Sequence, residues 1–472
     1  MRLSVQPQPS FADLELQAQG LRLDPVLAGI ADLLDQHGEL VELVRQDLVR
    51  GLQQPTRGRG GMTAEQVLRA FVLQRVKAWD LRELRERTAD GYTLRLFTRF
   101  LAAPVPRHDA FHRAFVRLTP ATVRAINEAI VQVAVTLKLE AGSQLRVDTT
   151  VVETNIHYPT DSALLWDAVR VITRLVRQLR PQLPGSPPPF PNRTRGARRR
   201  MQELQRLTPT QRQTQQAPKY RALIRVTEQV VQAARAVVAT VPAAGGSAPL
   251  GVALLAALGQ EITHYCALAD RVVAQTRRRV LQGETVPTED KLFSIFEPHT
   301  DLIKRGKAQT PVEFGHKVFL AESAIGLITD YRVLDGNPPD DTHVAPCLGR
   351  HHEWFGTAPH LFAADRGFYS ATTVAACTGA GVATECVPQR GGTKTPIRRA
   401  HEKSRAFRQG QRFRAGIEGR ISVLFRGRGM KRCPLHGPAR FEVFVGAAVL
   451  ANNLLVIAAH LHRRAVRRRR AA

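Results

Sequence analysis

The stretch "LFAADRGFYS" at positions 361–370 places an acid at the end of a short apolar run. Such a run predicts a central strand of a parallel sheet, and the glycine at 367 permits a sharp exit from it. Strand ends of this kind are where α/β proteins place their chemistry. Taken alone, Asp365 is more simply a turn former or a helix N-cap, so its meaning depends on whether other carboxylates join it.

The composition indicates a polyanionic partner. The chain has 472 residues, enough for two or three domains, and its 68 Lys and Arg residues exceed 41 Asp and Glu residues to give a net charge of +27. Nucleic acid is the first candidate, although a ribosomal or structural protein is equally basic. The five cysteines form no C-x-x-C pair, which favours neither a disulfide framework nor a structural zinc site.

Two segments bear on the cellular compartment. The start of the chain, "MRLSVQPQPSFADLELQ", has no apolar core of a signal peptide. Residues 441–460 are long enough to consider as a membrane span, but Glu442, Asn452, Asn453 and His460 favour a buried helix of a soluble protein. We therefore expect a cytoplasmic protein with no membrane partner.

The first part of the chain predicts a helical arm (1–60) and a second helical domain (61–140). Thr63 precedes an apolar stripe as a helix N-cap does, and residues 81–100 predict two helices around a turn at Asp90–Gly91. Short Arg-rich helices joined by tight turns are typical of a helix-turn-helix-like DNA-binding domain. A plain helical bundle explains them as well, with the arginines on a solvated face.

The middle of the chain begins with a β-branched strand at 144–153, within a first core segment at 141–157. A long helical insertion is expected at 158–310. It starts with a helix capped by Asp161 or Ser162, and a Pro-rich, then Arg-rich loop follows at 181–200. Helices are expected again at 201–280, interrupted at 242–249.

The pattern at 311–440 returns to alternating strands and helices. A hairpin is expected at 316–334. The elements expected after it are a helix at 341–355, a strand at 361–365, a helix at 371–380, a strand at 382–388, a basic loop, and a helix at 411–425. With the strand at 144–153 these give an α/β fold with a mixed five-stranded sheet flanked by helices. A C-terminal helix and a basic, disordered or phosphate-contacting tail complete the chain at 441–472.

Three acids are placed to meet at this sheet. Asp148 lies in the first strand, Asp365 ends a later one, and Glu418 stands out on an Arg-rich helix. Clustered carboxylates repel one another unless a cation lies between them. Oxygen-only ligands favour Mg²⁺ or Mn²⁺ over Zn²⁺.

Three stretches resemble a known family. These are "RVDTTVVETNIHYPTDSALL", "LFAADRGFYS" and "RAGIEGRISVLFRGRGMKRCPLHG", the last with an Arg–x–x–x–Glu pattern at Arg414 and Glu418. In this order they resemble a DDE transposase of a bacterial insertion sequence (ISNCY-like group), over about 144–160 and 311–440. Two positions depart from the family pattern, where Gln411 replaces an aromatic residue and Phe425 replaces a lysine, with Arg426 one step on.

The resemblance implies a ribonuclease H-like catalytic core and a reaction. Asp148, Asp365 and Glu418 would be catalytic and would hold two Mg²⁺ or Mn²⁺ ions. The enzyme would cut double-stranded DNA at the ends of the element and transfer the freed 3′-hydroxyl into target DNA. It would act as a homo-oligomer on DNA, associated with the bacterial nucleoid. The arginines expected to contact DNA are Arg198, Arg199, Arg200, Arg366, Arg414 and Arg426.

Two other functions remain open at this point. A ribonuclease H-like nuclease would use the same acids to hydrolyse DNA without ever joining it. A decayed transposase would bind DNA without catalysis, although acids at all three positions argue against that.

Overall fold

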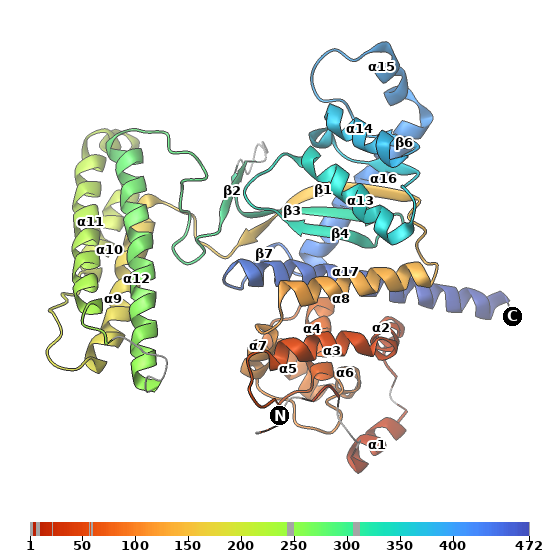
Figure 1. Cartoon of the computed structure of the whole chain (residues 1–472), viewed down its shortest axis with the longest axis horizontal. Coiled ribbons are helices and arrows are strands. Elements are labelled where there is room, and N and C mark those ends of the chain that lie inside the picture. The colour runs from red at the N-terminus through yellow and green to blue at the C-terminus, as the bar shows by residue number, and fades with distance from the viewer. Residues whose placement is uncertain are drawn as a thin grey trace. The chain divides into compact units, whose positions relative to one another are not determined.

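The computed structural model describes residues 3–5, 10–20, 22–55, 57, 60–242, 250–304 and 312–471 (Figure 1). The chain forms two compact units, one of residues 1–153 with 316–472 and one of residues 154–315. The first unit combines N-terminal helices with a mixed, open sheet that has helices on both faces, so the fold class is α/β. The predicted break at 242–249 lies almost entirely outside the described residues.

The sheet has seven strands in the order β2-β3-β1-β5-β6, with β4 paired to β3 and β7 paired to β1. Pairs β1–β5 and β5–β6 are parallel, and β2–β3 and β3–β4 are antiparallel. The predicted count of five strands is wrong, since β2 and β7 are too short to show a period in the sequence. The strands are β1 (Gln144–Thr154), β2 (Asp301–Lys304), β3 (Val312–Ser323), β4 (Ile328–Val333), β5 (Leu361–Ala363), β6 (Thr384–Cys386) and β7 (Arg432–Cys433).

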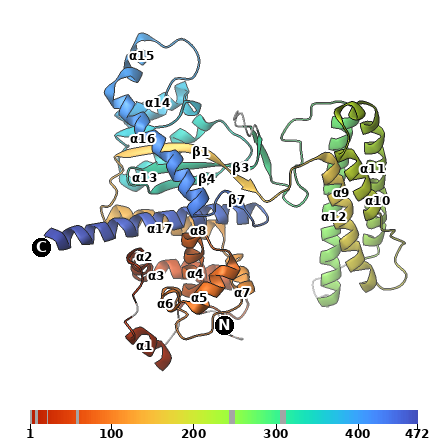
Figure 2. The same ribbon diagram turned by 180° about the vertical axis from the view of Figure 1, so that it is seen from behind.

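Helices cover both faces of this sheet. Figure 1 shows α13 and α14 on the near face, and Figure 2, from behind, shows α16 crossing the other face. The predicted hairpin and the predicted helices at 341–355 and 371–380 are confirmed. The helical elements of this part are η3 (Asp340–His343), α13 (Val344–Phe355), η4 (Arg366–Phe368), α14 (Ala371–Ala380), α15 (Pro396–Lys403), α16 (Arg405–Ser422), η5 (Val423–Gly427) and α17 (Pro438–Ala471).

Strand β1 separates two environments by simple alternation. Leu145 and Val147 are buried in an apolar cluster with Phe362. Arg146 and Asp148, on the opposite face, reach α16: Arg146 donates to the carbonyl of Phe413, and Asp148 pairs with Arg414. A polar face of β1 therefore lies under α16, although the strand is central in the sheet.

A buried ion-pair network fixes α16 against the sheet. The carboxylate of Glu322, on β3, is 0% exposed and accepts from Arg146 at 2.7 Å and from Arg420 of α16 at 2.8 Å. Arg420 also donates to Asn452 of α17 at 2.9 Å. A Cβ at Gly416 would overlap the Arg146 guanidinium, so a larger residue there would displace Arg146 from its contacts with Phe413 and Glu322.

The N-terminal helices share one core with α17. Buried residues of α2, α3, α4 and α8 pack with Val443, Ala447 and Leu450, and Asn127 of α8 donates to the carbonyl of Gly446. Thr63 caps α4 in a capping box with Gln66, as the sequence predicts in part. The helices are α1 (Phe11–Ala18), α2 (Pro25–Gln36), α3 (Gly38–Val49), α4 (Ala64–Lys77), α5 (Leu81–Asp90), α6 (Tyr92–Thr98), α7 (His108–Phe115) and α8 (Pro120–Thr136).

The second unit is largely helical and has its own apolar core. The prediction of a loop over all of 181–200 is wrong: Arg198–Arg200 lie on α10, whose Ala197 is buried in that core. The cap of α9 is Thr160 rather than Asp161 or Ser162. The elements are α9 (Asp161–Leu179), η1 (Arg180–Gln182), α10 (Thr194–Gln205), α11 (Pro209–Val238), α12 (Leu250–Thr276) and η2 (Arg277–Leu281), followed by β2.

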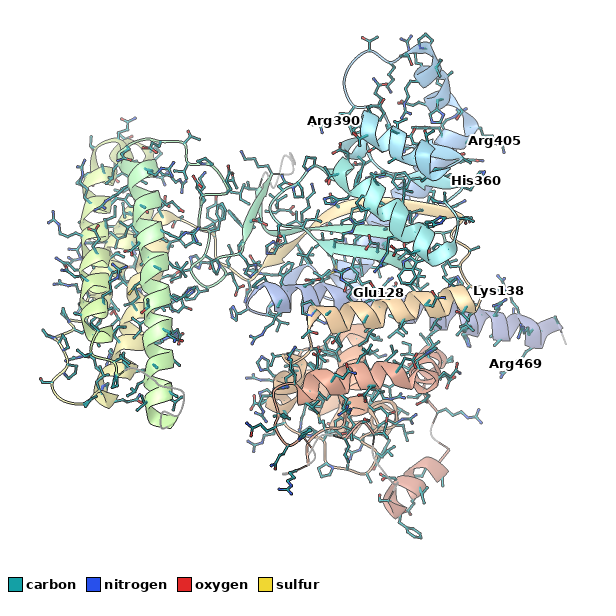
Figure 3. All side chains as sticks on the ribbon, viewed as in Figure 1. Glu128, Lys138, His360, Arg390, Arg405 and Arg469 are labelled. Atoms are coloured by element: carbon teal, nitrogen blue, oxygen red, sulfur yellow. The ribbon has the colours of Figure 1, made fainter. Side chains whose placement is uncertain are left out.

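Two further sequence expectations are corrected. The segment before 411, expected as a basic loop, contains α15 and the first turns of α16. Thr395 and Ser404 are the N-caps of these helices, and the many arginines of the segment leave it without an apolar period. The basic tail is the last part of α17, which stays helical to Ala471, and Figure 3 shows Arg469 near its free end. The buried residues of α17 lie between Phe441 and Ala458, and the helix continues from there into the basic residues of the tail.

Two described helical segments, 251–281 and 438–471, are long and apolar enough to cross a membrane by length and composition alone. In the second, 83% of the most apolar window is buried inside the protein, against 33% in the first. Asn452 and Asn453 in that window hydrogen-bond to residues 326 and 328. The prediction that 441–460 is a buried helix is thus confirmed, and the cytoplasmic location stays a prediction.

The first prediction concerns Glu322. Glu322→Gln leaves Arg146 and Arg420 without their shared carboxylate, and losing one partner of a buried pair costs about 3–5 kcal/mol. Urea denaturation is expected to show that loss, whereas Glu353→Gln, at an exposed ion pair, is expected to change stability by less than about 0.5 kcal/mol. Equal stability of the two variants would show that the network does not hold α16.

Candidate functional site

Strand pairing brings Asp148 and Asp365 to the same edge of the sheet. β1 and β5 are parallel neighbours, and the last paired residues are Arg146 and Ala363. Each aspartate follows its paired residue by two positions. The hypothesis that these acids approach each other required neighbouring strands, and the sheet order provides them.

One arginine contacts all three acids that the sequence singled out. Arg414 of α16 lies 3.3 Å from Asp148 and 4.0 Å from Asp365 through Nη2, and 3.0 Å from Glu418 through Nη1. The side chain of Asp148 is 12% exposed, that of Asp365 38% and that of Glu418 67%, so the cluster opens from the sheet toward solvent. Nε of Arg414 is buried and has no acceptor among the described residues.

Asp365 has two roles that the sequence presented as alternatives. Its Oδ1 accepts from the amide of Gly367 at 2.7 Å, so Asp365 is the N-cap of η4, while Oδ2 faces Arg414. A Cβ at residue 367 would lie 2.9 Å from Oδ1 of Asp365 and 3.2 Å from Oδ2 of Asp340. The cap holds the carboxylate rigidly, and the missing side chain of Gly367 leaves it room.

The structure adds a fourth acid, Asp340, to the three that the sequence singled out. Asp340, at the start of η3, accepts from Thr149 of β1 at 3.0 Å and pairs with Lys317 of β3 at 2.7 Å. Burial, with Arg332 and Lys317 nearby, lowers the pKa of His343, so this neighbour is neutral at pH 7. In the sequence, the two adjacent acids of "NPPDD" were the one pattern that could have drawn attention to Asp340. Only the fold shows that Asp340 faces β1.

Gln411 occupies the position at which the family pattern has an aromatic residue. Its amide donates to the carbonyl of Ala364 at 3.2 Å and to that of Cys386 at 2.5 Å. These carbonyls follow or end the neighbouring strands β5 and β6. Gln411 therefore holds α16 to the strand end that carries Asp365, a role no local sequence pattern reveals.

The donor chemistry of this cluster fits a hard divalent cation. Asp148, Asp365, Glu418 and Asp340 offer carboxylate oxygens only, the ligands that Mg²⁺ and Mn²⁺ prefer. Four carboxylates face two cations, Arg414 and Lys317, which leaves an excess of negative charge. In the described part of the chain, no three acids, histidines or cysteines are grouped so that they could share one ion, and in this cluster the Arg414 guanidinium pairs with the acids.

The remaining arginines of the sequence hypothesis have different environments. Arg366 and Arg426 belong to the same unit as the acids and are exposed, and neither forms an ion pair among the described residues. On α10, Arg198 is exposed, Arg199 lies 3.6 Å from Glu203, and Arg200 donates to the carbonyl of Gly196. Arg198 is the least committed of these three to contacts within the protein.

In the helical domain the structure divides the arginines that the sequence treated as one stripe. Arg95 donates to the carbonyls of Ala89, Leu101 and Ala103, and Arg99 pairs with Asp35 and Glu65. These two stabilise the fold. Arg82 and Arg85 are exposed on α5 and remain the arginines suited to a DNA contact.

The histidine pair of α13 has one buried member. His351 is 2% exposed, and its Nε2 lies 3.0 Å from the carbonyl of Gly142. Burial lowers the pKa of His351 to about 4. It is a neutral histidine of the interior.

Comparisons of the chain with protein-family models, with curated proteins and with solved structures found no match.

The second prediction tests whether Arg414 occupies the place of a metal cation. Arg414→Gln removes the cation among the acids, so the variant is expected to be less stable than the wild type in EDTA by about 1–3 kcal/mol. It is also expected to bind Mg²⁺ more tightly, because no guanidinium competes for the carboxylates. Thermal midpoints across a Mg²⁺ titration measure both effects.

Arg412→Gln is the matched control, since Arg412 is exposed on the same helix and has no ion pair among the described residues. It is expected to respond to Mg²⁺ as the wild type does. An identical Mg²⁺ response of the Arg414→Gln variant and the wild type would contradict the hypothesis that Arg414 occupies the place of a metal cation.

Proposed function

We propose that this chain is a DDE-type transposase with a ribonuclease H-like core, which cuts DNA at the ends of an element and joins the 3′-end to target DNA. The observation that carries the proposal is the convergence of Asp148, Asp365 and Glu418 on one guanidinium. These acids come from a central strand, a neighbouring strand end and a crossing helix. The +27 net charge supports a polyanionic substrate.

Asp148, Asp365 and Glu418 would hold the divalent ions, with Asp340 nearby. Bound ions of this kind activate the attacking oxygen and stabilise the leaving oxygen of a phosphodiester. The chain's own groups position and balance this site: the Gly367 amide fixes Asp365, and Lys317 holds Asp340. Arg366 and Arg426 are exposed in the same unit and suit contacts to phosphate oxygens.

The second candidate is a nuclease that hydrolyses DNA by the same acids without joining it. The same cluster supports it, because hydrolysis and transesterification need the same charges. A duplex with a pre-cut 3′-hydroxyl end, incubated with target DNA and Mg²⁺, separates the two functions. Joined products support the transposase, and hydrolysis without joining supports the nuclease.

The third prediction is that Asp148→Asn, Asp365→Asn and Glu418→Gln each lower cutting and joining together by at least about 100-fold. Each change keeps shape and removes one charge that would hold the ions. DNA binding is expected to survive, because exposed arginines supply it. Asp335→Asn, at an exposed acid in the loop after β4, is the control and is expected to cut normally. Near-normal cutting by any of the three variants removes that residue from the site.

The fourth prediction concerns binding to DNA. Phosphate contacts release counterions, so affinity is expected to fall at least about tenfold between low and moderate salt. Arg198→Gln is expected to reduce the slope of log affinity against log salt by about 1, as the loss of one phosphate contact does. An affinity that does not change with salt would contradict electrostatic binding.

A further inference from the structure

A second feature of the first unit lies in the helical core, apart from the acidic cluster. A cavity of about 620 Å³ is bounded by α4, α5, α7, the segment 429–435 and α17. This volume is in the range of small-molecule and cofactor sites. The acids Asp148, Asp365 and Glu418 do not line it, and neither do Arg366 and Arg426.

Four aromatic side chains stand in the wall of this cavity. Phe71, Trp79, Phe115 and Phe444 line it, and Phe71 and Phe115 meet edge to face with ring centroids 5.3 Å apart. Phe71 and Phe444 are buried, and Trp79 and Phe115 are partly exposed. Aromatic side chains of this kind suit a planar ring that stacks or packs edge-on.

The charged lining is almost entirely basic. Arg75, Arg82, Arg432 and Arg440 line the cavity with two histidines, and the one acid of the lining is Asp80. The carboxylate of Asp80 already accepts from the amides of Arg82 and Glu83 as the N-cap of α5. The lining therefore favours an anion.

Arg75 gives the cavity a specific point of attraction. Its guanidinium lies 4.3 Å from the centroid of the Phe444 ring. Within the described part of the chain no carboxylate pairs with it, and its buried Nε has no hydrogen-bond acceptor. Burial lowers the pKa of Arg75 to about 10, so the group is still charged at pH 7. A partly buried cation without a counter-charge is costly, and an anionic ligand would offset that cost.

We propose that this cavity binds a nucleotide, with the base between the aromatic walls and the phosphate on Arg75. A planar aromatic ring that carries a phosphate is the ligand class that meets both features at once. The nucleotide has two sources, a free mononucleotide or an unpaired nucleotide of a DNA strand. The proposal rests on the proposed function only in offering DNA as one source, since no acid of the cluster takes part.

Calorimetric titration with deoxyadenosine 5′-monophosphate in EDTA tests the proposal. Saturable binding is expected, and Arg75→Gln is expected to weaken it at least about tenfold, the effect of losing one charge-assisted contact. Deoxyadenosine without phosphate and inorganic phosphate are each expected to bind at least about tenfold more weakly. Arg113→Gln, at an exposed residue of α7 outside the lining, is the control and is expected to bind as the wild type does.

Absence of saturable binding, or equal affinity of the wild type and the Arg75→Gln variant, would overturn the proposal. If Arg75→Gln does not fold, Leu435→Trp tests it instead, because Leu435 lines the cavity and a larger ring there fills it. Loss of nucleotide binding in that folded variant supports the proposal, and unchanged binding overturns it.

Competition identifies the source of the nucleotide. A duplex with one unpaired adenosine that displaces the mononucleotide better than a fully paired duplex shows that DNA supplies it. Equal competition by the two duplexes shows that the free mononucleotide is the ligand. Asp365→Asn is expected to bind the mononucleotide as the wild type does while it loses DNA cutting, so failure of one proposal is distinguishable from failure of the other.

Discussion

The buried carboxylate of Glu322 is the interaction on which the rest of the candidate site depends. It receives Arg146 from β1 and Arg420 from α16, and so fixes the helix that carries Arg414 and Glu418 across the sheet. Removing one acid and two arginines from water is costly, and removing a single partner from the buried network would cost still more. The network fixes one position of α16, and the distances from Arg414 to the acids follow from that position.

Helix α17 connects the sheet to the N-terminal helices. One side of it packs with α2, α4 and α8, and its other buried residues pack with β3 and β4. Figures 1 and 2 show α8 and α17 side by side in both views. The acidic cluster and the aromatic cavity thus belong to one compact unit, and η5 and the segment 429–435 lead directly from α16 to the cavity wall.

Sequence reasoning predicted the parts of this fold that local pattern determines. The strand at 144–153, the hairpin and the helices at 341–355 and 371–380 each have a period or a cap. The short strand β7 has neither signal, and α10 has no side-chain cap. For α15, Thr395 is a cap, but no apolar period accompanies it in a run rich in arginine. The three acids were found because they lie in a strand, at a strand end and on an Arg-rich helix, within three stretches that resemble a family. Asp340, Lys317 and Gln411 join the site only through tertiary contacts.

The central claim is that Asp148, Asp365 and Glu418 form one divalent cation site. Fe²⁺ binds where Mg²⁺ binds in many oxygen-ligand sites, and with ascorbate and peroxide it produces hydroxyl radicals that cut the backbone beside it. Mass spectrometry of the fragments maps those cuts. The account predicts cuts near residues 148, 365 and 418 that excess Mg²⁺ suppresses. Cuts that cluster elsewhere, or that Mg²⁺ does not suppress, would contradict it.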